Sequence, residues 1–164
     1  MPATPKRTAR VATLEVRAQA VTVLPPLSRS RLVLIGTSAG GLATLLASAR
    51  LPELAGWIGL DPVDRTGTGR DAARNMPAPA IVLLAEPSGC NLFGSGRGIA
   101  RAFPHLRRSA LIEGASHCDF ESPTNNLCRV MCGTGSDELT ERIRHETVEA
   151  TLELLGARAA APPM

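Results

Sequence analysis

Aromatic side chains are scarce in this 164-residue sequence, and their scarcity limits what the protein can be. Phe and Trp make up 2% of the residues and Tyr is absent, whereas hydrophobic residues as a whole make up 44%. The core must therefore consist of Leu, Val, Ile and Ala, which is typical of helices packed on a parallel sheet. Nucleic-acid binding is disfavoured, because no aromatic side chains are interleaved with the N-terminal basic residues to stack on bases.

Long apolar runs are also lacking. No run approaches the roughly 18 to 20 residues that a membrane-spanning helix requires, so we expect no membrane span. The formal net charge of +3 depends largely on the N-terminus, where Glu15 and Arg17 interrupt any signal-peptide core. We therefore expect residues 1–30 to be a basic segment, partly helical or disordered, without an export signal and cytoplasmic as given.

Cysteine is infrequent but even in number, and the four residues are Cys90, Cys118, Cys128 and Cys132. An even set with three members close together suits disulfides in an oxidising compartment, so the localisation stays open. Zinc is the alternative, but the spacing contains no C-x-x-C pair. We expect buried or disulfide-bonded thiols, and no metal or organic cofactor.

Short apolar runs alternate with helical patterns from residue 31 onward. The predicted strands are 32–35, 57–60, 81–85 and 110–113, and the predicted helices are 39–49, 96–103 and a long helix from Ser136 that Gly156 ends. This alternation predicts right-handed crossovers and a mostly parallel sheet in a three-layer α/β/α fold. The length suits one domain, which we place at residues 31–156, with a disordered tail at 157–164.

A glycine-flanked serine follows the first predicted strand. Gly36, Thr37, Ser38, Ala39 and Gly40 fit G-x-S-x-G between a strand and a helix, the context in which this motif presents a nucleophile. The two glycines are expected to prevent collisions at a tight turn, and the N–H of Ala39 to point to a developing oxyanion. A glycine-rich turn without chemistry, or a phosphate-binding loop, is the alternative, although the P-loop lysine is absent.

A serine hydroxyl needs a base to remove its proton, and the sequence offers three histidines. His105 and His145 lie in charged surroundings and are interpreted as surface residues. His117 instead follows an apolar strand, in a loop on the strand's C-terminal side. That loop belongs to the same edge of a parallel sheet as Ser38, so His117 is the predicted base.

A carboxylate should orient the histidine and stabilise its imidazolium form. Asp61 and Glu86 each stand at the end of a predicted strand on that same edge, and Asp64 is a weaker third candidate. The positions alone leave the choice between Asp61 and Glu86 open. Asp119 is too close in sequence to His117 to orient it easily, and we expect it to shape the loop.

The segments "LVLIGTSAGG", "WIGLDPVD" and "LIEGASHCDFESPTNNLC" together resemble the α/β-hydrolase family, in particular its chlorophyllase-like and dienelactone-hydrolase-like esterases. The resemblance covers residues 31–155. It implies hydrolysis of small carboxylic esters through an acyl-enzyme on Ser38. Chlorophyllase-like members carry the acid at the "DPVD" segment, whereas the wider family carries it after the following strand, where Glu86 stands, and on this resemblance we rank Asp61 slightly ahead of Glu86. Thr37 occupies a position that is often His in this family.

The resemblance also implies that strands are missing. A complete member of this family has several strands before the nucleophile, and about 30 residues precede the first predicted strand here. We therefore expect the C-terminal half of the fold, without the loop that carries the second oxyanion N–H and with an unpaired apolar edge. A homodimer through that edge is one expectation. The alternative function is a non-catalytic module that is stable only as a dimer or with a partner.

Overall fold

Four parallel strands form the centre of the molecule. The computed structural model describes residues 32–122, 124, 126–133 and 135–156, so the predictions for 1–30 and 157–164 lie outside the described residues. The strands are β1 (Val33–Thr37), β2 (Gly56–Leu60), β3 (Ala80–Leu84) and β4 (Leu106–Leu111). They pair in the order β1-β2-β3-β4, each parallel to its neighbour.

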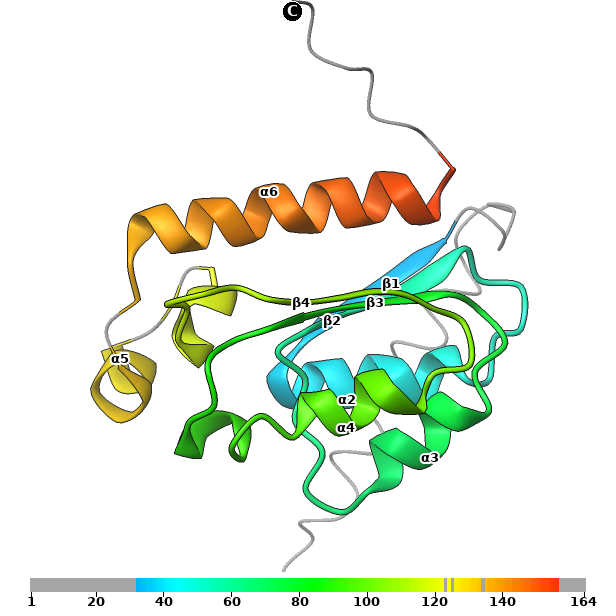
Figure 1. Cartoon of the computed structure of the whole chain (residues 1–164), viewed down its shortest axis with the longest axis horizontal. Helices are drawn as coiled ribbons and strands as arrows, with labels where there is room; N and C mark the ends of the chain where they lie inside the picture. Colours follow the sequence, from blue (N-terminus) through cyan, green and yellow to red (C-terminus); the bar gives the residue numbers. More distant parts are fainter. Residues whose placement is uncertain (1–31, 123, 125, 134, 157–164) are drawn as a thin grey trace, which may run out of the picture.

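Helices cover both faces of this sheet (Figure 1). One face carries α2 (Ser38–Ser48), α3 (Thr68–Arg74) and α4 (Gly96–Ala102), and the other carries the long α6 (Asp137–Leu154). The short helix α5 (Asn126–Cys132) and the single turns η2 (Gly89–Asn91) and η3 (His117–Phe120) lie beyond the carboxyl ends of the strands. The predicted three-layer α/β/α architecture is confirmed. No helix in the described ranges is long and apolar enough to cross a membrane.

The apolar runs of the strands serve two cores, because successive side chains of a strand point to opposite faces. Trp57 and Val82 belong to the core beneath α2, α3 and α4, where the Trp57 ring stacks on Phe103 with centroids 5.4 Å apart. Ile58 and Ile81 belong to the core beneath α6. Burial on both sides explains why β2 and β3 are almost uniformly apolar.

The fourth strand differs from prediction, and the segment before β3 contains a helix that was not predicted. The strand covers Leu106–Leu111, not 110–113. It was misplaced because its exposed and part-buried residues alternate, so it lacks the continuous apolar run on which the prediction relied. Its Arg108 pairs with Glu146 of α6 at 2.6 Å. The segment between β2 and β3 contains α3, a helix that was not predicted. The carboxylate of Asp64 accepts hydrogen bonds at its start from the N–H groups of Gly67 and Arg70.

Both ends of α6 agree with prediction. The Ser136 hydroxyl accepts a hydrogen bond from the N–H of Leu139 at 3.0 Å, as an N-cap does. Gly156 has φ 71°, the left-handed conformation in which glycine commonly ends a helix.

The strand β1 lies at one edge of the sheet within the described residues, and its Ile35 is 39% exposed.

Candidate active site

The parallel sheet brings the three predicted groups to one edge. Ser38 follows β1 directly, Asp61 follows β2 directly, and His117 lies in η3, a few residues after β4. Because all four strands are parallel, their carboxyl ends lie along the same edge of the sheet, where ligand sites of open α/β sheets occur.

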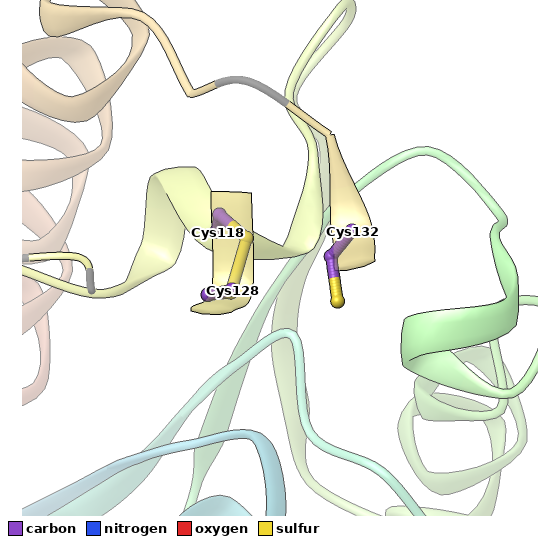
Figure 2. Close-up of side chains that lie close together, drawn as sticks. All are labelled: Cys118, Cys128 and Cys132. Carbon is purple, nitrogen blue, oxygen red and sulfur yellow. A yellow bond between two sulfur atoms is a disulfide. The ribbon is translucent and has the colours of Figure 1, made fainter. Parts of the chain in front are cut away.

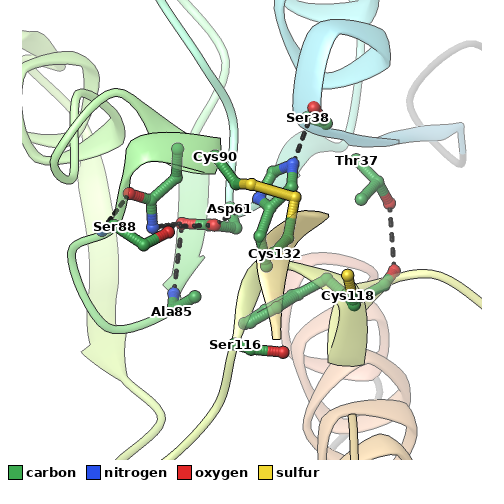
Figure 3. A network of polar contacts seen from close by, with 12 residues as sticks. Thr37, Ser38, Asp61, Ala85, Ser88, Cys90, Ser116, Cys118 and Cys132 are labelled. Atoms are coloured by element: carbon green, nitrogen blue, oxygen red, sulfur yellow. Dashed lines mark hydrogen bonds and ion pairs between the residues drawn. A yellow bond between two sulfur atoms is a disulfide. The ribbon is translucent and has the colours of Figure 1, made fainter. Parts of the chain in front are cut away.

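The three side chains form a continuous hydrogen-bonded chain (Figure 3). His117 Nε2 lies 2.9 Å from Ser38 Oγ, and His117 Nδ1 lies 2.6 Å from Asp61 Oδ2. Asp61 is 1% exposed and His117 is 5% exposed. Because a carboxylate only accepts hydrogen bonds, Nδ1 carries the proton, and the lone pair of Nε2 faces the serine hydroxyl. This is the arrangement in which an imidazole removes a proton from a serine.

The backbone at the serine is held in an unfavourable conformation. Ser38 has φ 54° and Asp61 has φ 41°, both in the left-handed region that non-glycine residues seldom occupy. Such strain persists only where the surroundings enforce it, and it is concentrated at functional sites. The turn therefore directs the Ser38 hydroxyl at the imidazole at a conformational cost.

The glycines needed at this corner differ in part from the predicted pair. A Cβ on Gly36 would lie 2.5 Å from the carbonyl oxygen of Gly40, so Gly36 is required, as predicted. A Cβ on Gly40 would meet nothing within 4 Å in the described structure, which corrects the predicted steric role of Gly40. Gly41 is the second glycine that the turn requires, because a Cβ at this position would lie 2.9 Å from both the Gly36 carbonyl oxygen and Pro62 Cβ.

Two alanine substitutions on neighbouring residues of α2 test this assignment. Gly41→Ala should lower the free energy of unfolding by about 1 to 3 kcal/mol, because backbone atoms must move to admit the methyl group. Gly40→Ala should leave it unchanged or raise it by up to about 1 kcal/mol through helix propensity. Urea unfolding of both variants measures the difference. Equal destabilisation by the two substitutions would contradict the assignment.

The other two residues of the predicted corner have distinct positions. Thr37 is the N-cap residue of α2, with extended backbone, and its hydroxyl donates to the carbonyl of Phe120 in η3 at 3.5 Å. Ala39 lies in the first turn of α2, where N–H groups have no acceptor within the helix. Its N–H is therefore available beside the hydroxyl of Ser38.

The carboxylate of Asp61 is oriented by two further donors. Its Oδ1 accepts from the N–H of Ala85 at 3.1 Å, and its Oδ2 accepts from Asn91 Nδ2 at 3.1 Å. These bonds come from the residue directly after β3 and from η2, whereas His117 approaches from η3. The carboxylate is thus held in one orientation while Oδ2 faces the imidazole.

Asn91 is a site residue that the sequence analysis did not find. Its side chain is fully buried, and its amide also donates to the carbonyl of Glu86 at 2.9 Å. Its oxygen accepts from the N–H groups of Ser88 and Gly94, each at 2.9 Å. Every donor and acceptor of this amide is therefore used. In the sequence, an Asn in a polar turn carries no signal that separates it from an ordinary turn residue.

Asn91→Ala should both destabilise the protein and impair the site. The substitution removes one of the donors to Asp61, the donor to the Glu86 carbonyl and the acceptor of the Ser88 N–H. Each group that stays buried and unsatisfied costs about 1 to 3 kcal/mol. Asn75→Ala is the matched control, because Asn75 is exposed and donates only to the carbonyl of Asp71. Thermal unfolding should show a clear loss for the first variant and almost none for the second. Similar melting temperatures would refute the role of Asn91.

The other acid candidates lie elsewhere. The side chain of Glu86 is exposed, and its backbone N–H donates to the carbonyl of Ala115 at 2.9 Å, so Asp61 and not Glu86 contacts the histidine. Asp64 is bound to the start of α3. His105 and His145 are exposed, as predicted.

Asp119 shapes the histidine loop, as predicted. It is 2% exposed, and its Oδ2 accepts from the N–H and the hydroxyl of Ser116 at 2.7 and 2.9 Å. Its Oδ1 accepts from the N–H of Ser136 at 2.7 Å. The loop that carries His117 is thereby attached to the start of α6.

The four cysteines form two disulfides, Cys90–Cys132 and Cys118–Cys128. The sulfurs of Cys118, Cys128 and Cys132 lie within 4.8 Å of one another, close enough to share a metal ion (Figure 2). Each of these sulfurs is bonded to another sulfur, whereas zinc is bound by thiolates. In this oxidised form the cluster is therefore structural, which agrees with the expectation of disulfide-bonded cysteines.

Comparison with known proteins identifies the fold. No family model matches the chain, and no curated protein matches it. A Klebsiella pneumoniae protein assigned as a dienelactone hydrolase is 14% identical, with a TM-score of 0.56 over 87% of this chain and 60% of that chain. This fold is of the α/β-hydrolase type. The esterase domain of a Rhodothermus marinus protein is 17% identical, with a TM-score of 0.49 over 70% of this chain and 61% of that chain.

The α/β-hydrolase-type fold confirms the predicted fold class. The chain spans about 60% of the length of the solved chains that it matches. The 14% identity to the Klebsiella pneumoniae protein establishes the fold alone, so the chlorophyllase-like interpretation stays a prediction.

Proposed function

We propose that this protein is a serine hydrolase that cleaves small carboxylic esters through an acyl-enzyme on Ser38. One observation carries the proposal: the unbroken hydrogen-bonded chain from Ser38 through His117 to Asp61, with contacts of 2.9 and 2.6 Å. The order Ser, Asp, His along the sequence is the one that α/β-hydrolases use. The three hydrogen-bonded side chains lie at the carboxyl edge of a parallel sheet, where ligand sites of open α/β sheets occur, and this supports the proposal.

The proposed reaction has two halves. Ser38 Oγ attacks the ester carbonyl carbon while His117 Nε2 takes the hydroxyl proton, and Asp61 stabilises the resulting imidazolium. The N–H of Ala39 donates to the oxyanion of the tetrahedral intermediate. Collapse breaks the bond to the alcohol oxygen, which receives the proton from His117. Water then attacks the acyl-enzyme by the same steps and releases the carboxylic acid and free Ser38.

A fluorophosphonate probe tests the proposal most directly, because it phosphonylates only an activated serine. We expect covalent addition to Ser38, located by mass spectrometry of the digested protein, together with hydrolysis of p-nitrophenyl acetate. An activated ester is the suitable substrate because its good leaving group relies least on the oxyanion donors. A folded protein that stays unlabelled, under conditions in which a known serine esterase reacts, would defeat the proposal.

The second candidate is a non-catalytic module that associates through β1. The observation in its favour is that β1, an uncharged strand whose Ile35 is 39% exposed, lies at the edge of the sheet formed by the described residues. Exposed apolar edges of this kind pair with other chains. The same labelling experiment decides between the two candidates when it is combined with analytical ultracentrifugation. An unlabelled, folded homodimer would support the second candidate over the first.

A further inference from the structure

The helix α5 is attached to the rest of the protein in an unusual way. Its apolar residues Leu127, Val130 and Met131 are 72, 82 and 70% exposed, and Cys128 is its buried residue. Burial of apolar surface therefore contributes little to holding α5 in place. Two disulfides hold it instead, one through Cys128 and one through its last residue, Cys132.

These disulfides lead to the two loops that carry the acid and base machinery (Figures 2 and 3). Cys90 lies in η2, next to Asn91, which donates to Asp61. Cys118 lies in η3, directly after His117. A seven-residue helix is thus bonded at one point to the loop that supports the acid and at another to the loop that carries the base.

The other attachments of these loops are at different places. The N–H of Glu86 donates to the carbonyl of Ala115, which joins the two loops where they leave β3 and β4. Asp119 joins η3 to the start of α6, on the opposite face of the sheet from α2. Thr37 also donates to the carbonyl of Phe120 in η3, and Asn91 of η2 is linked to His117 of η3 through Asp61. All of these attachments are hydrogen bonds, whereas the route through Cys90, α5 and Cys118 joins η2 to η3 by covalent bonds.

We propose that α5 and its two disulfides form a covalent cross-brace that positions His117 between Asp61 and Ser38. This inference rests on the proposed function of the same site. The cysteines do not touch the reacting atoms, so their role is to position the histidine. Displacing a catalytic group by about 1 Å can cost on the order of a hundredfold in rate. Because Asp119 still holds η3, we expect a loss of about ten- to a hundredfold without the brace.

A redox consequence follows from the same geometry. A small dithiol reductant converts each disulfide to two thiols and is itself oxidised to its cyclic disulfide. Reduction should therefore release α5 from both loops and slow the reaction of Ser38. Removal of the dithiol and air oxidation should restore the initial rate.

Paired serine variants test the cross-brace: Cys90→Ser with Cys132→Ser, Cys118→Ser with Cys128→Ser, and all four together. The rate constant for fluorophosphonate labelling of Ser38 should fall about ten- to a hundredfold, most in the fourfold variant. The low-field NMR signal of the His117 Nδ1 proton should shift or broaden, a change that a purely stabilising role would not produce. Amide exchange of β2 and β3 should stay slow below the melting temperature.

Two controls separate positioning from general damage. Val130→Ser alters α5 without touching a disulfide, and it should label at the wild-type rate. Dithiol should slow the wild-type protein and leave the fourfold variant unaffected.

The outcomes separate this inference from the proposed function. Wild-type protein that never labels defeats both, whereas wild-type protein that labels at the same rate as all three variants overturns the cross-brace alone. Fast amide exchange of β2 and β3 in every variant would show that the disulfides maintain the sheet, and this result also overturns the cross-brace. Slower labelling with an intact sheet and a changed Nδ1 signal supports it.

Discussion

Replacing Ser38 with Ala should lower kcat for p-nitrophenyl acetate by about four to six orders of magnitude, the loss expected when a serine nucleophile is removed from a triad. In the proposed mechanism, the substitution removes the atom that forms the bond to the substrate. It also removes the hydroxyl that donates a hydrogen bond to His117 Nε2, which lies 2.9 Å from Ser38 Oγ. The measurement is the steady-state rate, with the uncatalysed rate subtracted.

Ser122→Ala is the matched control for this substitution. Ser122 is exposed, and its hydroxyl accepts a hydrogen bond from Arg144 at 3.0 Å, away from the triad. We expect this variant to retain the wild-type rate, and both variants to unfold close to the wild-type temperature. If Ser38→Ala hydrolysed the ester as fast as Ser122→Ala, the observed turnover would have another origin and the mechanism would be wrong.

Asp61→Asn should lower kcat by about four orders of magnitude while leaving the fold intact. An asparagine of the same shape can present its amide N–H to His117 Nδ1, which then must act as an acceptor. The proton moves to Nε2, and the ring can no longer take a proton from Ser38. The negative charge that stabilises the imidazolium is lost as well. Steady-state kinetics and circular dichroism of the purified variant measure both parts of the prediction.

Glu86→Gln supplies the comparison, because Glu86 was the rival candidate for the same role. Its side chain is exposed, and its contacts to Ala115 and Asn91 are made by the backbone, which the substitution preserves. We expect at most a twofold change in kcat. A large loss in Glu86→Gln with normal activity in Asp61→Asn would reverse the assignment of the acid.

Much of the fold was predictable from the sequence because its signals are local. The apolar runs at β1, β2 and β3 indicate strands buried on both faces, and α6 has a serine cap and a terminal glycine. The strand β4 was misplaced because it contains a charged residue, Arg108. This side chain is part-buried through its ion pair with the distant Glu146. A pairing across 38 residues leaves no local periodic signal.

The site was predictable in outline for the same reason. Ser38, His117 and Asp61 each follow a recognisable strand, and a parallel sheet brings strand ends together. The steric need for a glycine at 41 in place of 40 depends on Pro62, which lies 21 residues later. Short motifs describe the chain before and after a turn, and they contain no information on what packs against it.

The sequence by itself determined the alternation of strands and helices apart from α3 and α5, the nucleophile corner and the set of groups able to form a triad. Only the tertiary structure decided between Asp61 and Glu86, identified Asn91 and paired the cysteines. The reason is physical. Local propensities act over a few residues, whereas the choice of an acid depends on which carboxylate folding buries within 2.6 Å of an imidazole 56 positions away.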